Sequence, residues 1–259
     1  MIKRSDKSGQ VTIFIIIAVV IVVVGLLAFF VYPRIQTETG FDSENPSVFI
    51  QNCMEKEIEN NVETISLQGG SLEPEFYYMY DNSKIEYLCY TNKDYLTCVV
   101  QQPMLKQHIE SEIKNSIVNS EKLCFEKLMQ NYIEQGENPQ IIDGMTYVKL
   151  LPNKIEVTFD KILTLAKEGS QRYENFKVVV DNNLYELVGI VNSIVEWETV
   201  YGDADTSSYM TYYPNLKVEK KKQDDGTTVY ILTERDSENK FQFASRSMAW
   251  PSGYGVTNA

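Results

Sequence analysis

Apolar residues divide the chain into a short N-terminal segment and a long mixed region. Residues 11–32 contain 22 consecutive positions without a charge. A helix of that length spans about 33 Å, at roughly 1.5 Å per residue, which is enough to cross a bilayer. Because lipid offers the backbone no hydrogen-bond partners, the pattern predicts a transmembrane helix here.

The region that follows begins as a linker and continues as a helix. Residues 33–46 are polar and contain two prolines and a glycine, which is typical of a linker. Asn45 can cap a helix, and Pro46 suits its first position. Apolar residues at three- or four-residue spacing over 50–65 predict one buried helix face, and Gly69-Gly70 predicts its end.

The remaining sequence predicts an α+β ectodomain of antiparallel sheets with packed helices. We expect a hairpin over 84–101 around Thr91–Asp94, helical spacing from Pro103 to Gly136 with a break near 119–120, and a later helix over 182–200. Strands are predicted at 144–151, 153–166, 170–181, 214–222, 227–235 and 239–248. The pattern favours two packed lobes, 47–140 (helical, with the hairpin) and 141–259 (β-rich, with one helix); a single domain is the alternative.

Charge sets the expected topology and excludes one class of partner. Three basic residues and one acidic residue give positions 1–9 a net charge of +2, so the other 250 residues carry −14 of the total −12. The positive-inside rule then places the N-terminus in the cytoplasm and residues 33–259 outside the cell. So acidic a chain repels phosphate, which excludes nucleic acid as an expected partner.

The start of the chain, KRSDKSGQVTIFIII (residues 3–17), resembles the class III signal peptides of archaeal type IV pilin-like proteins. The resemblance implies that a leader peptidase removes residues 1–9 by cutting between Gly9 and Gln10. The helix over 10–32 would then remain as a membrane or filament-core helix. Phe14 stands where bacterial pilins usually carry Glu, so the likeness is to the archaeal version. An uncut signal anchor is the alternative.

The four cysteines, at 53, 89, 98 and 124, lie on the expected outer side, where thiols favour disulfides. Of three possible pairings, the expected hairpin favours Cys89–Cys98, since facing strand positions bring Cβ atoms close together. That choice leaves Cys53–Cys124. A zinc site is the weaker alternative, because no C-x-x-C is present and His108 is the only histidine.

The layout also resembles archaeal single-pass surface proteins that have a Cys-bearing helix ending in QGG, here Cys53 and residues 68–70.

No catalytic signature is found, so no catalytic residue, cofactor or metal site is predicted, and the chain is not expected to be an enzyme. His108 is expected to be a packed helix residue. Tyrosines are frequent, and tyrosine suits recognition surfaces as well as half-buried sheets. Two groups of them are candidate binding surfaces: Tyr77, Tyr78 and Tyr80 near the hairpin, and Tyr209, Tyr212 and Tyr213 after the late helix.

These patterns favour a pilin-like cell-surface protein, either a filament subunit or a minor pilin, that displays its ectodomain for assembly or adhesion. Its expected partners are the membrane through residues 11–32, the leader peptidase, and copies of itself or other surface proteins. One alternative is a membrane-anchored binding protein that never polymerises, which the linker breakers favour. A membrane-anchored enzyme is the other.

Overall fold

The computed structural model describes Ile17, Val20 and residues 45–166 and 170–249. Chain contacts divide the protein into two units, Met1–Asp42 and Ser43–Ala259; the second is called the folded unit below. The predicted leader, the Gly9–Gln10 cleavage site and almost all of the segments 10–32 and 33–46 lie outside the described residues. Within the part of the chain that is described, no helix combines the length and apolarity that crossing a bilayer requires.

Helix α2 (Pro46–Leu67) begins and packs as the sequence predicts. The Asn45 side chain accepts a hydrogen bond from the Val48 amide at 3.4 Å, and Pro46 occupies the first turn. One face of the helix is buried by a stripe of five residues with at most 1% exposure: Ile50, Met54, Ile58, Val62 and Ile65. Fully burying an aliphatic side chain of this size stabilises the fold by roughly 1.5–3 kcal/mol. The helix is therefore held by packing along its whole length.

Six strands form the first sheet: β1 (Tyr77–Tyr80), β2 (Ser83–Tyr90), β3 (Val99–Val100), β8 (Leu216–Lys222), β9 (Thr227–Glu234) and β10 (Lys240–Arg246). Their order is β1-β2-β10-β9-β8, and β3 also pairs with β2. The β2–β10 pair is parallel and the others are antiparallel. This sheet takes strands from both sides of residue 140, so the lobe boundary expected there does not separate the two sheets.

The second sheet contains β4 (Gln140–Ile142), β5 (Thr146–Leu151), β6 (Lys154–Ala166) and β7 (Ser170–Asp181). Both β4 and β5 pair with β6, as does β7, and every pair is antiparallel. Alternation along β6 places Lys161 on the same buried side as Phe159 and Leu163, and the register with β7 shifts between Phe159 and Ile162. There the ammonium lies 2.6 Å from Asp143 and 3.0 Å from Glu121. Burial lowers the pKa of Lys161, but these two carboxylates offset that effect and raise it overall.

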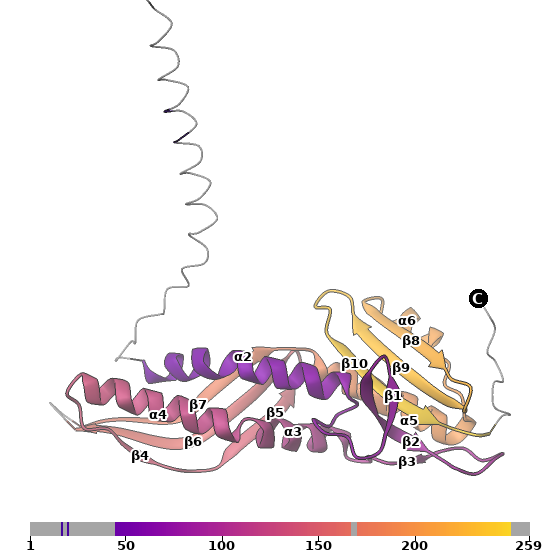
Figure 1. Cartoon of the computed structure of the whole chain (residues 1–259), viewed down its shortest axis with the longest axis horizontal. Helices are drawn as coiled ribbons and strands as arrows, with labels where there is room; N and C mark the ends of the chain where they lie inside the picture. Colours follow the sequence, from indigo (N-terminus) through magenta and orange to yellow (C-terminus); the bar gives the residue numbers. More distant parts are fainter. Residues whose placement is uncertain (1–16, 18–19, 21–44, 167–169, 250–259) are drawn as a thin grey trace, which may run out of the picture. The chain divides into compact units, whose positions relative to one another are not determined.

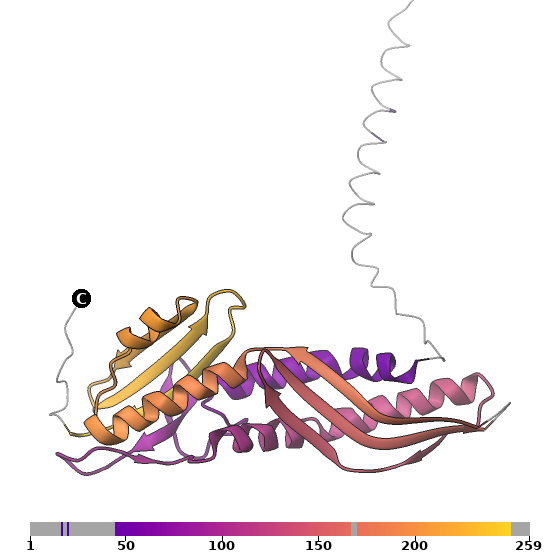
Figure 2. The same ribbon diagram turned by 180° about the vertical axis from the view of Figure 1, so that it is seen from behind.

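The helices connect the sheets. α3 (Leu105–Ser116) and α4 (Val118–Glu134) follow each other closely, while α5 (Leu184–Tyr201) and the short α6 (Ser207–Tyr212) come late in the chain. α2 packs against β7, α3 and α4 and also reaches β10, so it lies along both sheets (Figure 1). α5 packs against β10, β2 and β3, and the reverse view shows it beside the first sheet (Figure 2). The expected α+β fold with packed helices is confirmed.

Both predicted disulfides are present. Cys53–Cys124 joins α2 to α4 with a Cα–Cα distance of 6.0 Å, and Cys89–Cys98 has one of 5.4 Å. No cysteine is free, which contradicts the zinc alternative.

The hairpin used to infer the second disulfide has another register. Cys89 faces Val100 across the β2–β3 pair, and Cys98 precedes β3. The reason is that the backbone of residues 95–96 pairs with Met248 instead of with β2. The Tyr95 amide donates to the Met248 carbonyl at 2.8 Å, and the Leu96 carbonyl accepts from the Met248 amide at 3.0 Å.

The β1–β2 hairpin was not predicted from the sequence. Its two-residue turn, Asp81–Asn82, has positive φ at both positions (45° and 63°), the geometry that tight hairpins prefer. Strand β4 and helix α6 were not predicted either. The break in the long helical region falls at Ile117 rather than at 119–120.

Candidate functional site

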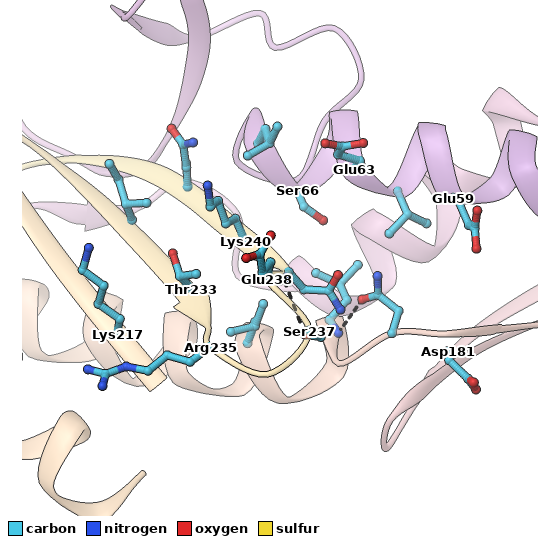
Figure 3. Close-up of a pocket in the computed structure, with 18 of the residues that line it drawn as sticks. Glu59, Glu63, Ser66, Asp181, Lys217, Thr233, Arg235, Ser237, Glu238 and Lys240 are labelled. Carbon is cyan, nitrogen blue, oxygen red and sulfur yellow. Dashed lines mark hydrogen bonds between the residues drawn. The ribbon is translucent and has the colours of Figure 1, made fainter. Parts of the chain in front are cut away.

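A groove of about 1000 Å³ opens between the two sheets of the folded unit (Figure 3). Its walls are the C-terminal half of α2, the end of β7 with the start of α5, and one face of β8–β10. Strand alternation places Lys217, Thr233 and Lys240 on that face. Buried apolar side chains, among them Val62 and Leu187, form the floor. The groove is therefore apolar at depth and charged around its rim.

Charges of both signs line the groove. On α2, Glu59 and Glu63 lie one helical turn apart and are exposed. The sheet side carries the cations Lys217, Arg235 and Lys240 together with the acids Glu219 and Glu238 (Figure 3). Lys217 also pairs with Glu219 at 2.9 Å. Among the described residues, no partner contacts the Arg235 guanidinium or the Lys240 ammonium. The groove therefore suits a polar ligand that carries both signs of charge better than a simple anion or cation.

The first tyrosine group is only partly a surface. Tyr78 and Tyr80 pack against the buried cluster of Ile85, Tyr87, Val229 and Ala244 on the sheet face. Burial raises the pKa of Tyr87, whose hydroxyl pairs with Thr227 at 2.9 Å. Tyr77 is 38% exposed, with the Lys84 ammonium 4.8 Å from its ring centre. Most of this group therefore serves the sheet core, and only Tyr77 among the three named candidates is clearly exposed.

The second tyrosine group divides in the opposite way. The Tyr209 hydroxyl lies 2.7 Å from the Ser193 hydroxyl and helps to hold α6 on α5. Tyr212 and Tyr213 are 81% and 54% exposed, and both line a second cavity of about 670 Å³. That cavity borders the groove, because Asp181, Asn182, Ser237 and Asn239 line both.

His108 belongs to a compact polar cluster at the end of α2. Its Nε2 lies 2.8 Å from the Ser71 hydroxyl, which donates to the Glu86 carboxylate at 2.5 Å. In a Ser–His–acid nucleophile the acid orients the imidazole and the serine donates to it. Here the acid accepts from the serine, and Ser71 is only 6% exposed. This arrangement links α2, β2 and α3 rather than preparing a nucleophile.

The cluster also raises the pKa of Glu86 and explains the glycines of the QGG turn. Burial raises the pKa of Glu86, the Ser71 hydrogen bond lowers it, and the nearby Glu112 carboxylate raises it further. Gly69 has φ +92°, and a Cβ there would lie 2.8 Å from the Glu86 Cβ. Only glycine therefore allows β2 to approach the end of α2 so closely.

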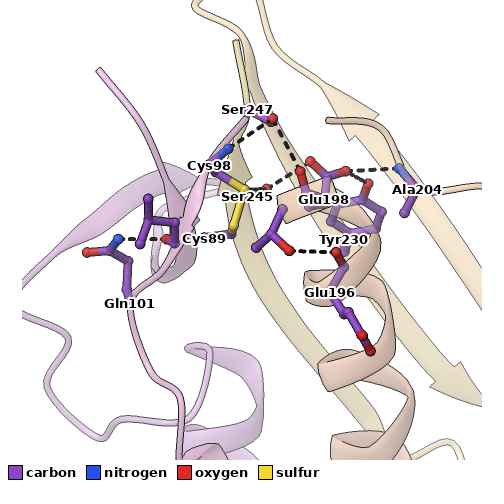
Figure 4. Close-up of a disulfide and its surroundings, with 11 residues drawn as sticks. Cys89, Cys98, Gln101, Glu196, Glu198, Ala204, Tyr230, Ser245 and Ser247 are labelled. Carbon is purple, nitrogen blue, oxygen red and sulfur yellow. Dashed lines mark hydrogen bonds between the residues drawn. A yellow bond between two sulfur atoms is a disulfide. The ribbon is translucent and has the colours of Figure 1, made fainter. Parts of the chain in front are cut away.

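A buried carboxylate on α5, Glu198, was not predicted from the sequence (Figure 4). Glu198 is 2% exposed and accepts hydrogen bonds from the Tyr230 hydroxyl, the Ser245 hydroxyl at 3.1 Å and the Ala204 amide at 3.2 Å. Burial, followed by the Glu198 charge, raises the pKa of Tyr230 well above its ordinary value, so the phenol stays a donor. A carboxylate with three protein donors is built to join α5 to the sheet. Its signal was the continuation of the apolar α5 stripe to position 198.

Metal-ligand geometry is not found in the described part of the chain, which contains no group of three His, Cys, Asp or Glu side chains placed to hold an ion. Asp203 pairs with Lys220 and Lys222, and Asp205 accepts from the Ser207 amide and the hydroxyls of Ser207 and Ser208. Both carboxylates are therefore already bonded to groups of the protein.

Comparison of the chain with protein-family models, with curated proteins and with solved structures finds no match.

Proposed function

We propose that this protein is a pilin-like, surface-displayed protein whose residues 11–32 sit in the membrane or in a filament core. The folded unit would then lie outside the cell and provide the contacts for assembly or adhesion. The 22-residue uncharged segment, the basic residues before it and the likeness of residues 3–17 to class III leaders support this proposal.

The observation that carries the proposal is the pairing of every cysteine. All four are joined in two disulfides, with sequence separations of 71 and 9 residues. Disulfides persist in oxidising compartments and are rare in the cytosol of mesophiles. An oxidising environment outside the cell is therefore the setting in which this domain would keep its covalent ties.

Two alternatives differ in assembly and in chemistry. A membrane-anchored binding protein that does not polymerise is favoured by Pro33, Gly40 and Pro46, since these breakers oppose a continuous helical rod. A membrane-anchored enzyme is less favoured. The two polar clusters that resemble catalytic groups, around Ser71 and around Glu198, are buried and have protein partners.

The test begins with native surface material. Sheared filaments and the detergent-extracted membrane are recovered separately, and the N-terminus of the protein is sequenced by mass spectrometry in each. A chain beginning at Gln10 in the filament fraction is the expected result. A chain beginning at Met1 or Ile2 would sink the processed leader, and recovery only as detergent-soluble monomers would defeat the filament role.

Matched variants make the result specific. Gly9→Val should block cleavage and hold the chain in the membrane fraction, whereas Gly40→Val, in the linker, should be processed normally. Labelling with a thiol reagent that does not cross membranes, without reductant, should modify no cysteine. Labelling of the untreated protein would contradict the oxidised state.

A further inference from the structure

The second cavity, called the asparagine–tyrosine cavity below, combines three kinds of side chain. Tyr212 and Tyr213 present exposed rings on one side. Five of the chain's 18 asparagines line it, Asn153, Asn182, Asn183, Asn215 and Asn239, which concentrates amides in one place. At about 670 Å³ it has the size of a small-ligand site. No lysine or arginine lines it.

Four of the five side-chain amides are each held by a hydrogen bond at one end, which leaves the other end free. The side-chain oxygen of Asn183 accepts from the side-chain nitrogen of Asn239 at 2.7 Å. The side-chain oxygen of Asn182 accepts from the Leu184 backbone amide at 2.8 Å. The Asn215 amide donates to Asp236 at 2.5 Å. Among the described residues, the side-chain nitrogens (Nδ2) of Asn182 and Asn183 and the side-chain oxygens (Oδ1) of Asn215 and Asn239 have no partner. The cavity therefore offers fixed donors and fixed acceptors together.

Four carboxylates complete the lining: Asp181, Glu186, Glu234 and Asp236. Burial raises the pKa of Glu234, and the neighbouring charges of Asp236 and Glu186 raise it further. No cationic side chain in the lining offsets the charge of these carboxylates. An anionic ligand would be repelled.

From this combination we infer that the asparagine–tyrosine cavity binds a neutral or amine-bearing oligosaccharide. A sugar hydroxyl both donates and accepts, so it can pair with the amide ends and the carboxylates at once. The apolar face of a pyranose ring can lie on an exposed tyrosine ring, where both groups lose contact with water. A simple cation would use only the carboxylates and would leave the amide donors unpaired.

The adjoining groove extends the site. Asp181 and Ser237, labelled in Figure 3, lie on the border between the two hollows. An oligosaccharide longer than the cavity can therefore continue toward Glu59 and Lys240. This inference deepens the proposed function by naming the ligand class for adhesion. Sugar binding and N-terminal processing are separate measurements, so either can fail without the other.

The test uses the full chain in detergent micelles on immobilised oligosaccharides. The probes are neutral hexose oligomers, N-acetylglucosamine oligomers, their deacetylated forms and uronic-acid oligomers, with oligolysine as a further probe. Binding to neutral or amine-bearing sugars without binding to uronic-acid oligomers is expected. Binding to none of the sugars, or to oligolysine alone, would overturn the inference.

Variants then locate the site by affinity for the best-bound sugar. Tyr212→Ala with Tyr213→Ala should weaken binding about tenfold or more, because both stacking rings are lost. Tyr212→Phe with Tyr213→Phe should keep most of it, since the rings remain. Tyr201→Ala removes a 57%-exposed tyrosine outside the cavity and should change nothing. If the double alanine variant keeps its thermal melting point and also binds normally, the sugar binds elsewhere and the inference is wrong.

Discussion

The two disulfides close loops of very different length, and their contributions to stability should differ accordingly. Cys53–Cys124 encloses 71 residues and Cys89–Cys98 encloses 9. In the chain-entropy model these loops correspond to about 4.4 and about 2.6 kcal/mol at 25 °C. Cys53→Ala with Cys124→Ala should therefore cost about 2 kcal/mol more than Cys89→Ala with Cys98→Ala. For a domain of this size that difference lowers the melting temperature by a further ~4–8 °C.

The assay is guanidinium unfolding of the oxidised full chain in detergent, followed by circular dichroism, for the wild type and both double variants. Packing works against the predicted order, because Cys89 and Cys98 are 0% and 3% exposed whereas Cys53 is half-buried. With reductant, no protein is cross-linked, so the differences in unfolding free energy between the three proteins report packing alone. Subtracting them from the differences measured without reductant leaves the cross-link term, the stabilisation due to each disulfide. Equal cross-link terms, or a larger one for Cys89–Cys98, would refute the loop-entropy reasoning.

Three further substitutions, two of them with a matched control variant, test the buried polar clusters and one backbone contact. Tyr230→Phe should lower the free energy of unfolding by about 2 kcal/mol, because it removes a donor from the buried Glu198 carboxylate. Tyr209→Phe breaks a partly exposed neutral pair and should lower it by about 1 kcal/mol. Equal melting temperatures for the two variants would contradict the role of Glu198. Because the folded pKa of Glu86 lies above its ordinary 4.5, protonated Glu86 stabilises the folded state fully below pH 4.5. This stabilisation is lost as pH rises through the folded pKa. Glu86→Gln should therefore gain on the wild type as pH rises from 4 to 7, by about 1.4 kcal/mol per unit of pKa shift, and a pH-independent difference in urea midpoints would argue against this. Gly144→Ala would place a Cβ 1.7 Å from the Asp160 carbonyl oxygen and should destabilise the fold by about 3 kcal/mol or more. A Cβ at Gly189 meets nothing within 4 Å, so Gly189→Ala should stabilise α5 by up to about 1 kcal/mol. Matching unfolding curves for the two variants would show that the Gly144 contact is not as close as described.

Long periodic elements could be predicted from the sequence because one physical signal dominates each of them. The α2 stripe, the Asn45 cap and the strand pair β6–β7 follow directly from apolar spacing and local capping chemistry. The parallel pairing of β2 with β10 could not be predicted, since its partners are separated by more than 150 residues and carry no local signal. The correct Cys89–Cys98 pairing came from an incorrect register. Met248 competes for the backbone of residues 95–96, which only the folded chain brings within reach.

The candidate sites divide in the same way. Composition could indicate that tyrosines matter, but their burial depends on which sheet face they meet. Tyr78 and Tyr80 pack against the buried cluster of the first sheet, while Tyr212 and Tyr213 stay exposed beside asparagines from their own segment and three others. Glu198 was hidden because its donors, Tyr230 and Ser245, come from distant strands. Its position on an otherwise apolar helix face was the one readable sign.

The Cys53–Cys124 bond also determines how the folded unit would respond to mechanical tension. A pull applied to the chain ahead of Pro46 reaches Cys53 within two turns of α2 and passes through the bond to Cys124. The 71-residue stretch between them is then shielded from extension, which hides roughly 240 Å of contour length at about 3.4 Å per residue. A domain tethered at its N-terminal end and gripping a ligand near residues 212–239 would therefore lengthen mainly in the chain that follows Cys124, and a force–extension trace would gain the hidden length on reduction.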